Sequence, residues 1–190
     1  MKTQIRVLGI DDAPFSFSDK YVNVIGVIMR GGGYLEGVLK NQIHIDGLDA
    51  TQSIKEMIEN SRYMFQLKAI MIDGIALGGF NIVDIDKLNA ETKIPVITIT
   101  RDYPNFEKIK VALQKNFNDW ETRWDILSQG ELKKIKTAHN PIYVKTAGIP
   151  LRQAEEIIKI STIRGVLPEP IRMAHLIASG ITTGGSHGKA

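Results

Sequence analysis

The sequence predicts an α/β fold in which a mixed sheet is flanked by helices, and two observations support this. Strand-like segments follow one another without a helix up to residue 45, and helical and strand-like segments alternate after that point. A run of strands followed by such alternation is typical of a sheet that carries helices on its faces. A length of 190 residues is ordinary for one domain, and no repeat or linker divides the sequence. We therefore expect residues 1–190 to form a single domain.

The first 45 residues are expected to form three strands. Residues 4–10 and 21–29 are rich in β-branched and other apolar residues, which is typical of buried strands. Gly31, Gly32 and Gly33 have the backbone freedom that a tight reversal needs. Residues 34–45 are therefore expected to pair with the second strand as a hairpin.

Helices and strands are expected to alternate from residue 46 onward. Asp49 or Thr51 can cap the first helix, because a short polar side chain satisfies the unpaired N–H groups of a helix start. The glycine-rich tail, residues 180–190, is expected to be mobile or to lie on the surface. The segments assigned by their apolar spacing are the strands 67–72, 94–99 and 141–146 and the helices 80–88, 106–113, 117–127, 151–163 and 168–179.

An aromatic stripe in the second half allows two interpretations. Phe117, Trp120, Trp124 and Leu127 repeat at helical spacing, and aromatic side chains in such a row can stack on bases. Periodic apolar residues more often point into the core. We therefore expect this stripe to face the core.

Composition excludes several classes of site and location. The chain has no cysteine, so disulfides and thiolate-bound metals are excluded, and any metal must sit on oxygen or imidazole ligands. No apolar run approaches the roughly 20 residues that a membrane span needs, and the amino terminus lacks the apolar core of a signal peptide. We expect a cytoplasmic protein without a membrane partner.

The charge distribution suggests one basic surface. The net charge of +3 is a mild excess and does not by itself indicate nucleic acid. A basic stretch can follow a phosphate backbone, although a solvated surface is the more common explanation. The stretch comprises Lys133, Lys134, Lys136, His139, Lys145 and Arg152.

Aspartates at the ends of predicted strands are the candidate chemical groups. They are Asp11 with Asp12, Asp46 with Asp49, and Asp73. Such carboxylates converge if their strands are neighbours, since open α/β sheets bind ligands beyond the carboxyl ends of their strands. Mg²⁺ prefers oxygen ligands and can assist phosphodiester hydrolysis. Each aspartate could instead serve only its own turn, and strand alternation allows only one of Asp11 and Asp12 to face such a site.

Four segments resemble one known family over nearly the whole chain. They are Gly9–Asp12, Asp46–Thr51, Asp73–Asn81 and Leu167–His175, and they look like the archaeal endonuclease dU family. That family is similar to endonuclease V, a ribonuclease H-like enzyme that cuts beside deaminated bases with Mg²⁺. The resemblance therefore implies a ribonuclease H-like, endonuclease V-like domain.

The resemblance also implies roles for individual residues. Asp11 and Asp73 match two metal ligands of endonuclease V, and Asp49 fits the place of its third ligand, a glutamate, with Asp46 as the alternative. Arg101 falls where the relative has a lysine, and a cation there can contact the scissile phosphate.

Two departures concern how the nucleic acid is handled. Residues 34–37 stand where the relative has a proline-containing wedge, but they include no proline. Residues 147–149 stand where the relative has a histidine before a late helix, but they include no histidine.

These observations predict a metal-dependent endonuclease that acts on DNA or RNA, at uracil or another deaminated base, with Mg²⁺ or Mn²⁺. A nucleic-acid-binding module without catalysis is the alternative, and a structural or oligomerisation protein is a third hypothesis. Cleavage that depends on the metal separates the first from the others. The residues assigned to the metal are Asp11, Asp46, Asp49 and Asp73, those assigned to catalysis are Asp11, Asp49, Asp73 and Arg101, and those assigned to nucleic acid are Arg101, Lys145 and Arg172.

Overall fold

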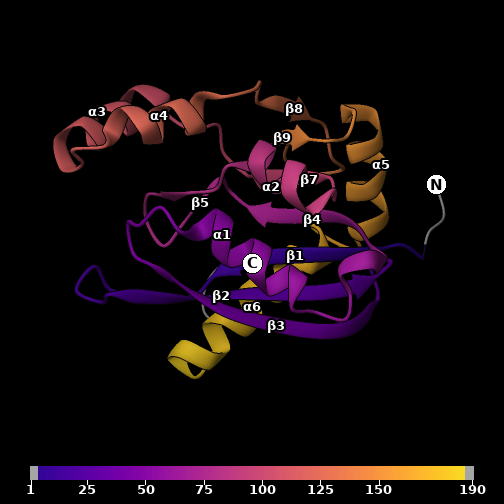
Figure 1. Ribbon diagram of the computed structural model, residues 1–190. Coiled ribbons are helices and arrows are strands. Elements are labelled where there is room, and N and C mark those ends of the chain that lie inside the picture. Colours follow the sequence, from indigo (N-terminus) through magenta and orange to yellow (C-terminus); the bar gives the residue numbers. More distant parts are fainter. Residues whose placement is uncertain (1–3, 187–190) are drawn as a thin grey trace.

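A seven-stranded mixed sheet forms the centre of the computed structural model, which describes residues 4–186 (Figure 1). The strand order is β3-β2-β1-β4-β7-β9-β8. β1, β4 and β7 run parallel to one another, and the outer neighbours pair antiparallel. The predicted mixed sheet is confirmed. The strands are β1 (Arg6–Asp12), β2 (Tyr21–Arg30), β3 (Tyr34–His44), β4 (Leu67–Asp73), β7 (Val96–Thr100), β8 (Lys133–Ile135) and β9 (Ile142–Ala147).

Helices cover both faces of the sheet. α1 (Ala50–Glu59) and α2 (Ile85–Thr92) lie in front of it in Figure 1, and α5 (Leu151–Ser161) and α6 (Glu169–Thr183) cover the other face. α3 (Phe106–Asn116) and α4 (Trp120–Ser128) pack together beyond the carboxyl end of β4, at the upper left of the view. A 3₁₀ turn, η1 (Met64–Gln66), precedes β4. Within residues 4–186, no helix is long and apolar enough to cross a bilayer.

Two glycines show which side of β1 each helix covers. A Cβ on Gly26, in β2, would meet the side chain of Met57 in α1. A Cβ on Gly9 would lie 2.1 Å from the backbone carbon of Pro170 in α6. Because successive residues of a strand face opposite sides, Val7, Gly9 and Asp11 all face α6. The missing side chain of Gly9 allows the backbones of β1 and α6 to touch.

The predicted helix over residues 80–88 is wrong in its first half. Asn81–Ile82 form the short strand β6, which pairs with β5 (Ala76–Leu77). Gly78 and Gly79 make the turn between them, both with positive φ. The helix begins only at Ile85, because Asp84 caps it by accepting a hydrogen bond from the Lys87 N–H.

Two further details differ from the sequence prediction. β8 was not predicted, since three residues at the edge of a sheet carry little periodicity. α6 ends at Thr183 instead of Ser179, and Gly184 follows with a φ of 76°. Residues 180–183 of the predicted tail are therefore helical, while residues 187–190 lie outside the described part of the chain.

The aromatic stripe is only partly in the core. Leu127 is 3% exposed, but the two tryptophans and Phe117 are half-buried. Phe117 packs edge-on against Phe80, and Trp124 packs against Phe106. The stripe thus joins α3 and α4 to each other and to the loop before β6, so the expected core position holds for Leu127 alone.

Replacing Gly9 with alanine tests the contact between β1 and α6. The added methyl group has no space, and inserting a methylene-sized group into a packed core costs about 1–3 kcal/mol. We expect the variant to unfold at lower urea concentration than the parent. Gly180→Ala is the matched control, because nothing lies within 4 Å of a Cβ there and alanine favours the helix. Equal midpoints for Gly9→Ala and the parent would contradict the contact.

Candidate active site

Asp11 and Asp73 lie side by side at the carboxyl end of the parallel strands. Ile10 pairs with Ile72 in the register of β1 and β4, and each aspartate is the next residue of its strand. Their side chains therefore point to the same face, the one that α6 covers. Asp11 is 5% exposed, and Asp73 is half-buried.

Asp12 follows Asp11 at the end of β1, and its carboxyl group lies close enough to Asp11 and Asp73 to raise the pKa of both. Its Oδ2 accepts a hydrogen bond of 2.8 Å from the Gly78 N–H, which joins the end of β1 to the β5–β6 turn. Its own N–H donates to Asp11 Oδ1 at 2.9 Å. Asp12 therefore fixes the backbone of the site and holds one oxygen of Asp11 in place.

His175, from α6, completes the surroundings of Asp11. Its Nδ1 lies 2.9 Å from Asp11 Oδ2, so one proton is shared between these two atoms. The helix rises about 7.5 Å from Pro170 to His175, and β1 advances about 6.6 Å from Gly9 to Asp11. The contact between Gly9 and Pro170 thus brings the histidine level with the aspartate. His175 was not among the residues predicted from the sequence.

Arg101 approaches Asp73 from the end of the next strand, β7. Asp73 pairs with Ile99 in the register of β4 and β7, and Arg101 follows two residues later. Burial raises the pKa of Asp73, and the positive charge of Arg101 opposes this rise. The structure therefore brings together three of the predicted residues, Asp11, Asp73 and Arg101.

Burial and mutual repulsion make the carboxyl groups of the site hold protons strongly. The pKa of Asp11 is raised to about 9, chiefly by burial and then by the charges of Asp73 and Asp12. Burial also raises the pKa of Asp12 and that of Asp73, against the opposing charges of Arg101 and His175 on Asp73. The site thus has an excess of negative charge, which protons or a cation can neutralise.

Asp46 and Asp49, the other two predicted metal ligands, lie in the loop before α1. Their hydrogen-bond partners are His44 and residues at or next to β6. Asp49 receives hydrogen bonds from the backbone and ring of His44 and from Asn81, the last at 2.6 Å. Partial burial raises the pKa of Asp49, but these bonds outweigh it and leave the pKa below its ordinary value. Asp46, with a φ of 55°, accepts from the Phe80 N–H at 2.7 Å. These contacts attach the loop to β6, and a third-ligand role for either aspartate stays a prediction.

Lys145 and Arg172 also have hydrogen-bond or ion-pair partners within the protein. Lys145 is 5% exposed, and its Nζ donates to the carbonyls of Leu127 and Gln129 at 2.5 and 2.7 Å. Burial lowers its pKa. Arg172 pairs with the buried Glu169 at 2.6 Å, one turn earlier in α6. Neither side chain lies on an open basic surface.

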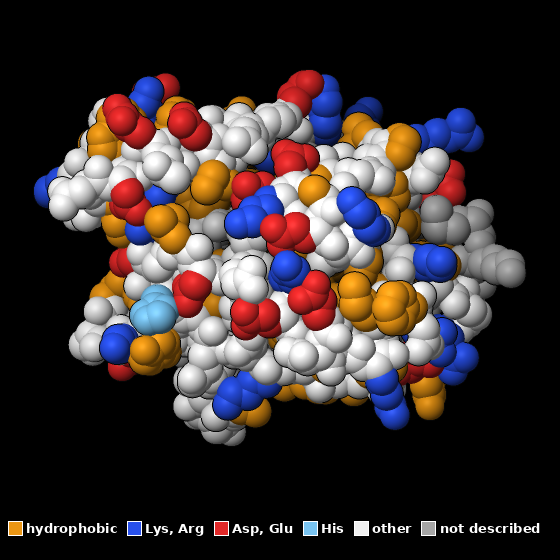
Figure 2. Space-filling model, viewed as in Figure 1, with side chains coloured by type: hydrophobic (Ala, Val, Ile, Leu, Met, Phe, Trp, Pro, Cys, Tyr) orange, Lys and Arg blue, Asp and Glu red, His pale blue; other side chains and the backbone are white. Residues whose placement is uncertain are grey.

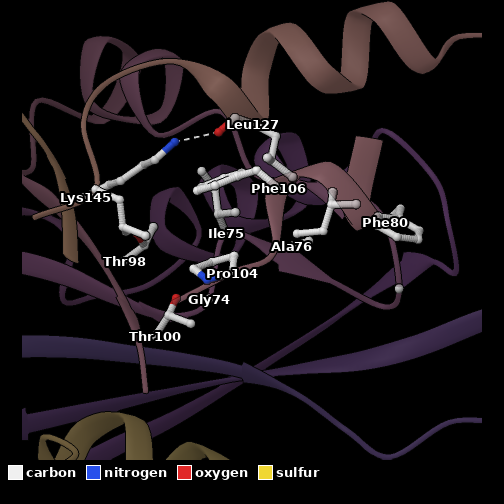
Figure 3. A pocket seen from close by; sticks show the side chains of 13 residues that line it. Gly74, Ile75, Ala76, Phe80, Thr98, Thr100, Pro104, Phe106, Leu127 and Lys145 are labelled. Atoms are coloured by element: carbon white, nitrogen blue, oxygen red, sulfur yellow. Dashed lines mark hydrogen bonds between the residues drawn. The ribbon is translucent and has the colours of Figure 1, made fainter. Parts of the chain in front are cut away.

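A cavity of about 220 Å³ lies beside the site. It opens between the carboxyl ends of β4 and β7 and the α3–α4 pair, and Figure 3 shows Lys145 reaching across its rim to Leu127. Its wall is mainly apolar, with Gly74 directly after Asp73 on one side and Phe106 on the other. Thr98 pairs with Lys145 across β7 and β9, so the cavity faces the side of the sheet opposite Asp73.

The donor set at Asp11 suits a divalent cation that also binds other ligands. Within residues 4–186, no group of three or more His, Asp or Glu side chains is arranged to hold a metal. Mg²⁺ is commonly held by only one or two carboxylates together with water and substrate phosphates. Asp11 and Asp73 provide two such carboxylates, and the excess negative charge at this position is what a cation would neutralise.

Residues 34–37, which stand where the relative has its proline-containing wedge, lie far from these aspartates. Arg30 pairs with both Tyr34 and Arg6, the first residue of β1. The segment therefore lies at the opposite end of β1 from Asp11. It is not placed to act on a nucleic acid bound at the site.

Comparison with solved structures agrees with the fold. A protein of unknown function from Archaeoglobus fulgidus has 43% sequence identity and a TM-score of 0.85, covering 94% of this chain and 98% of that one. Ciona intestinalis endonuclease V, in complex with an inosine-containing 24mer DNA, has 13% identity and a TM-score of 0.61, covering 90% and 83%. Human endonuclease V has 14% identity and a TM-score of 0.58, covering 92% and 83%. The predicted ribonuclease H-like fold is confirmed.

Comparison of sequences gives the family. A "UPF0215 protein" of Methanosarcina acetivorans is 49% identical over all of this chain and 97% of its own length, and one of Methanothermobacter thermautotrophicus is 47% identical over 100% and 94%. The family model described as endonuclease dU matches residues 3–182. The chain therefore belongs to the endonuclease dU family.

Proposed function

We propose that the protein is a metal-dependent endonuclease that hydrolyses phosphodiester bonds in DNA or RNA. The observation that carries the proposal is the pair Asp11 and Asp73, set side by side on one face of the sheet with His175 and Arg101 beside them. Membership of the endonuclease dU family supports it.

Asp11 and Asp73 would hold the cation, Mg²⁺ or Mn²⁺, and the phosphate of the substrate would supply further oxygens. When bound, such a cation makes water a better nucleophile and stabilises the leaving oxygen. Asp49 or Asp46 would join as third ligand only by giving up a bond to His44, Asn81 or Phe80. With the aspartates bound to the cation, His175 would be the group of the site that takes up and releases a proton.

His175 and Arg101 have complementary tasks in this mechanism. Asp11 occupies the Nδ1 side of His175, so Nε2 is the atom that can exchange a proton with the attacking water or the leaving oxygen. Arg101, beside Asp73, would contact the scissile phosphate with a planar, permanently charged group.

The cavity beside Gly74 would accept the target base. An apolar cavity of about 150 Å³ holds benzene, so about 220 Å³ suffices for a pyrimidine ring turned out of its stack. The Lys145 ammonium has three N–H groups, and two of them bind the carbonyls of Leu127 and Gln129. The third suits the carbonyl oxygen that deamination creates in place of an amino group, which favours uracil over cytosine.

A nucleic-acid-binding module without catalysis is the second candidate. The absence of a three-ligand group among the described residues favours it. It predicts binding that weakens with salt and no cleavage with any metal.

A cleavage assay tests the proposed function. Labelled uracil-, inosine- and undamaged substrates are incubated with Mg²⁺, Mn²⁺ or EDTA. We expect cleavage with metal only, and a loss of several orders of magnitude in Asp11→Asn and Asp73→Asn. Asp125→Asn, at an exposed position of α4, serves as the control and should retain activity. Lys145→Met should lower the preference for uracil over cytosine. A parent without cleavage under every condition would leave the binding module as the better proposal.

Thermal melts with and without metal test the ligands independently of catalysis. A cation that binds only the folded protein stabilises it by about 2.7 kcal/mol at a hundredfold excess over its Kd. We expect Mg²⁺ or Mn²⁺ to raise the melting temperature of the parent more than that of Asp73→Asn. The metal-free variant should melt no lower than the metal-free parent, because it removes one repelling charge. Lower metal-free stability of Asp73→Asn with an unchanged response to metal would instead assign Asp73 a purely structural role.

The pH dependence of metal-free stability tests the raised pKa of Asp11. Its folded pKa, about 9, exceeds the unfolded value, so the folded state binds more protons between these values. The free energy of unfolding should therefore fall as pH rises from about 4 to 9, by about 1.4 kcal/mol for each unit of difference. Urea unfolding in EDTA at pH 5, 7 and 9 measures this. Asp11→Asn should show a flatter profile, and parallel profiles would refute the raised pKa.

A further inference from the structure

A second hollow, of about 800 Å³, lies between the β8–β9 loop and the carboxyl-terminal half of α5. We propose that this hollow, called here the α5 groove, binds the phosphate backbone of nucleic acid several nucleotides away from the scissile bond. The inference deepens the proposed function, since it assumes a nucleic-acid substrate. The residues that define the groove are Lys134, Lys136, His139, Lys159 and Arg164 on its rim and Ile158 in its floor.

The rim of the groove is strongly basic. It carries four side chains with a permanent positive charge, all exposed, and His139 besides. Among its lining residues, all within the described chain, Glu155 is the sole acid. Figure 2 shows Lys and Arg side chains along the upper right margin, where β8 and α5 lie in Figure 1, whereas acids and bases are mixed at the centre of that face.

The basic residues come from three separate segments of the chain. They belong to β8 and the loop after it, to α5, and to the loop after α5. From the sequence alone, a solvated helix face was the more common explanation. Such a face would place its charges on one helix, whereas these charges come from several elements. The loop after β8 is also ordered from within, since Thr137 Oγ1 donates to the Asn140 carbonyl and accepts from the His139 N–H. The charges are therefore held in a defined arrangement around one hollow.

The groove lies on the face of the sheet that α5 and α6 cover, toward the end of β1 that is farther from the aspartates. Ile163, which lines the groove, lies 3.0 Å from a Cβ placed on Gly32, and the preceding Gly31 N–H donates to the Ile5 carbonyl, just before β1. The strand advances about 16 Å from Arg6 to Asp11. A duplex advances about 3.4 Å per base pair, so a backbone running along this face from the aspartates would reach the groove about five base pairs from the cut.

A salt titration of DNA binding tests the α5 groove. The probe is a fluorescently labelled undamaged 24-base-pair duplex, measured by anisotropy in EDTA so that no cleavage occurs. In the variant Lys134→Glu/Lys159→Glu, two phosphate contacts are lost, and each contributes about 0.9 to the slope of log K against log salt. Between about 50 and 200 mM salt, the affinity of the parent should therefore fall about tenfold more than that of the variant.

The matched control is Lys68→Glu/Lys87→Glu, which changes the net charge equally at two exposed positions outside the groove. Its salt slope should equal that of the parent. A groove variant with the parent's slope, a parent that does not bind the duplex, or tighter binding of a polyglutamate peptide than of DNA would each overturn the inference. Groove-dependent binding by a parent that cleaves nothing would sustain the inference and refute only the proposed function.

Discussion

The direct contact between α6 and β1 at Gly9 is the constraint on which the rest of the site depends. It sets the height of α6 along the strand, and this height brings His175 to Asp11. The same helix covers Asp11, and burial is the main cause of its raised pKa. A side chain at position 9 would move α6 outward, so that Asp11 would lose its proton partner and its low-dielectric surroundings together. One glycine thus links the packing of the core to the electrostatics of the site.

The charges at the site are balanced only in part. Burial raises the pKa of Asp11, Asp12 and Asp73, and repulsion between carboxylates adds to this at Asp11 and Asp73, while Arg101 and His175 oppose it at Asp73. Such a cluster is neutralised either by a proton, as between Asp11 and His175, or by a divalent cation. With two carboxylates instead of three, the site would bind a cation best when a phosphate is also present. Metal and substrate would then bind cooperatively, so the site would hold its cation mainly when a nucleic acid is bound.

The sequence predicts those parts of the site that local patterns determine. Asp11 and Asp73 follow apolar strands, and the meeting of parallel strand ends at one edge was enough to place them together. Asp46, Asp49 and Lys145 were also predicted to belong to the site. Their hydrogen-bond partners, however, are residues distant in the sequence, such as Phe80, Asn81 and Leu127. His175 lies on a helix whose height is set by Gly9, so no local spacing marks it. The apolar pattern of the segment 80–88 suits a helix as well as a strand, and it was assigned to helix. The turn at Gly78 and Gly79 instead pairs Asn81–Ile82 with β5 as a strand.

The positions of the carboxylates and the cavity restrict how a nucleic acid can bind. Asp73 pairs with Ile99 and faces α6, whereas Thr98 pairs with Lys145 and lines the cavity on the opposite face. A strand lying across this edge would place its phosphate beside Asp11 and Asp73 on one side. Its base could reach the cavity only by leaving the stack and passing beyond Gly74 to the other side. Turning a base out costs least where pairing is already weakened, as at a mismatched or deaminated base. The arrangement of the two faces would therefore add selectivity for such sites before any contact to the base is made.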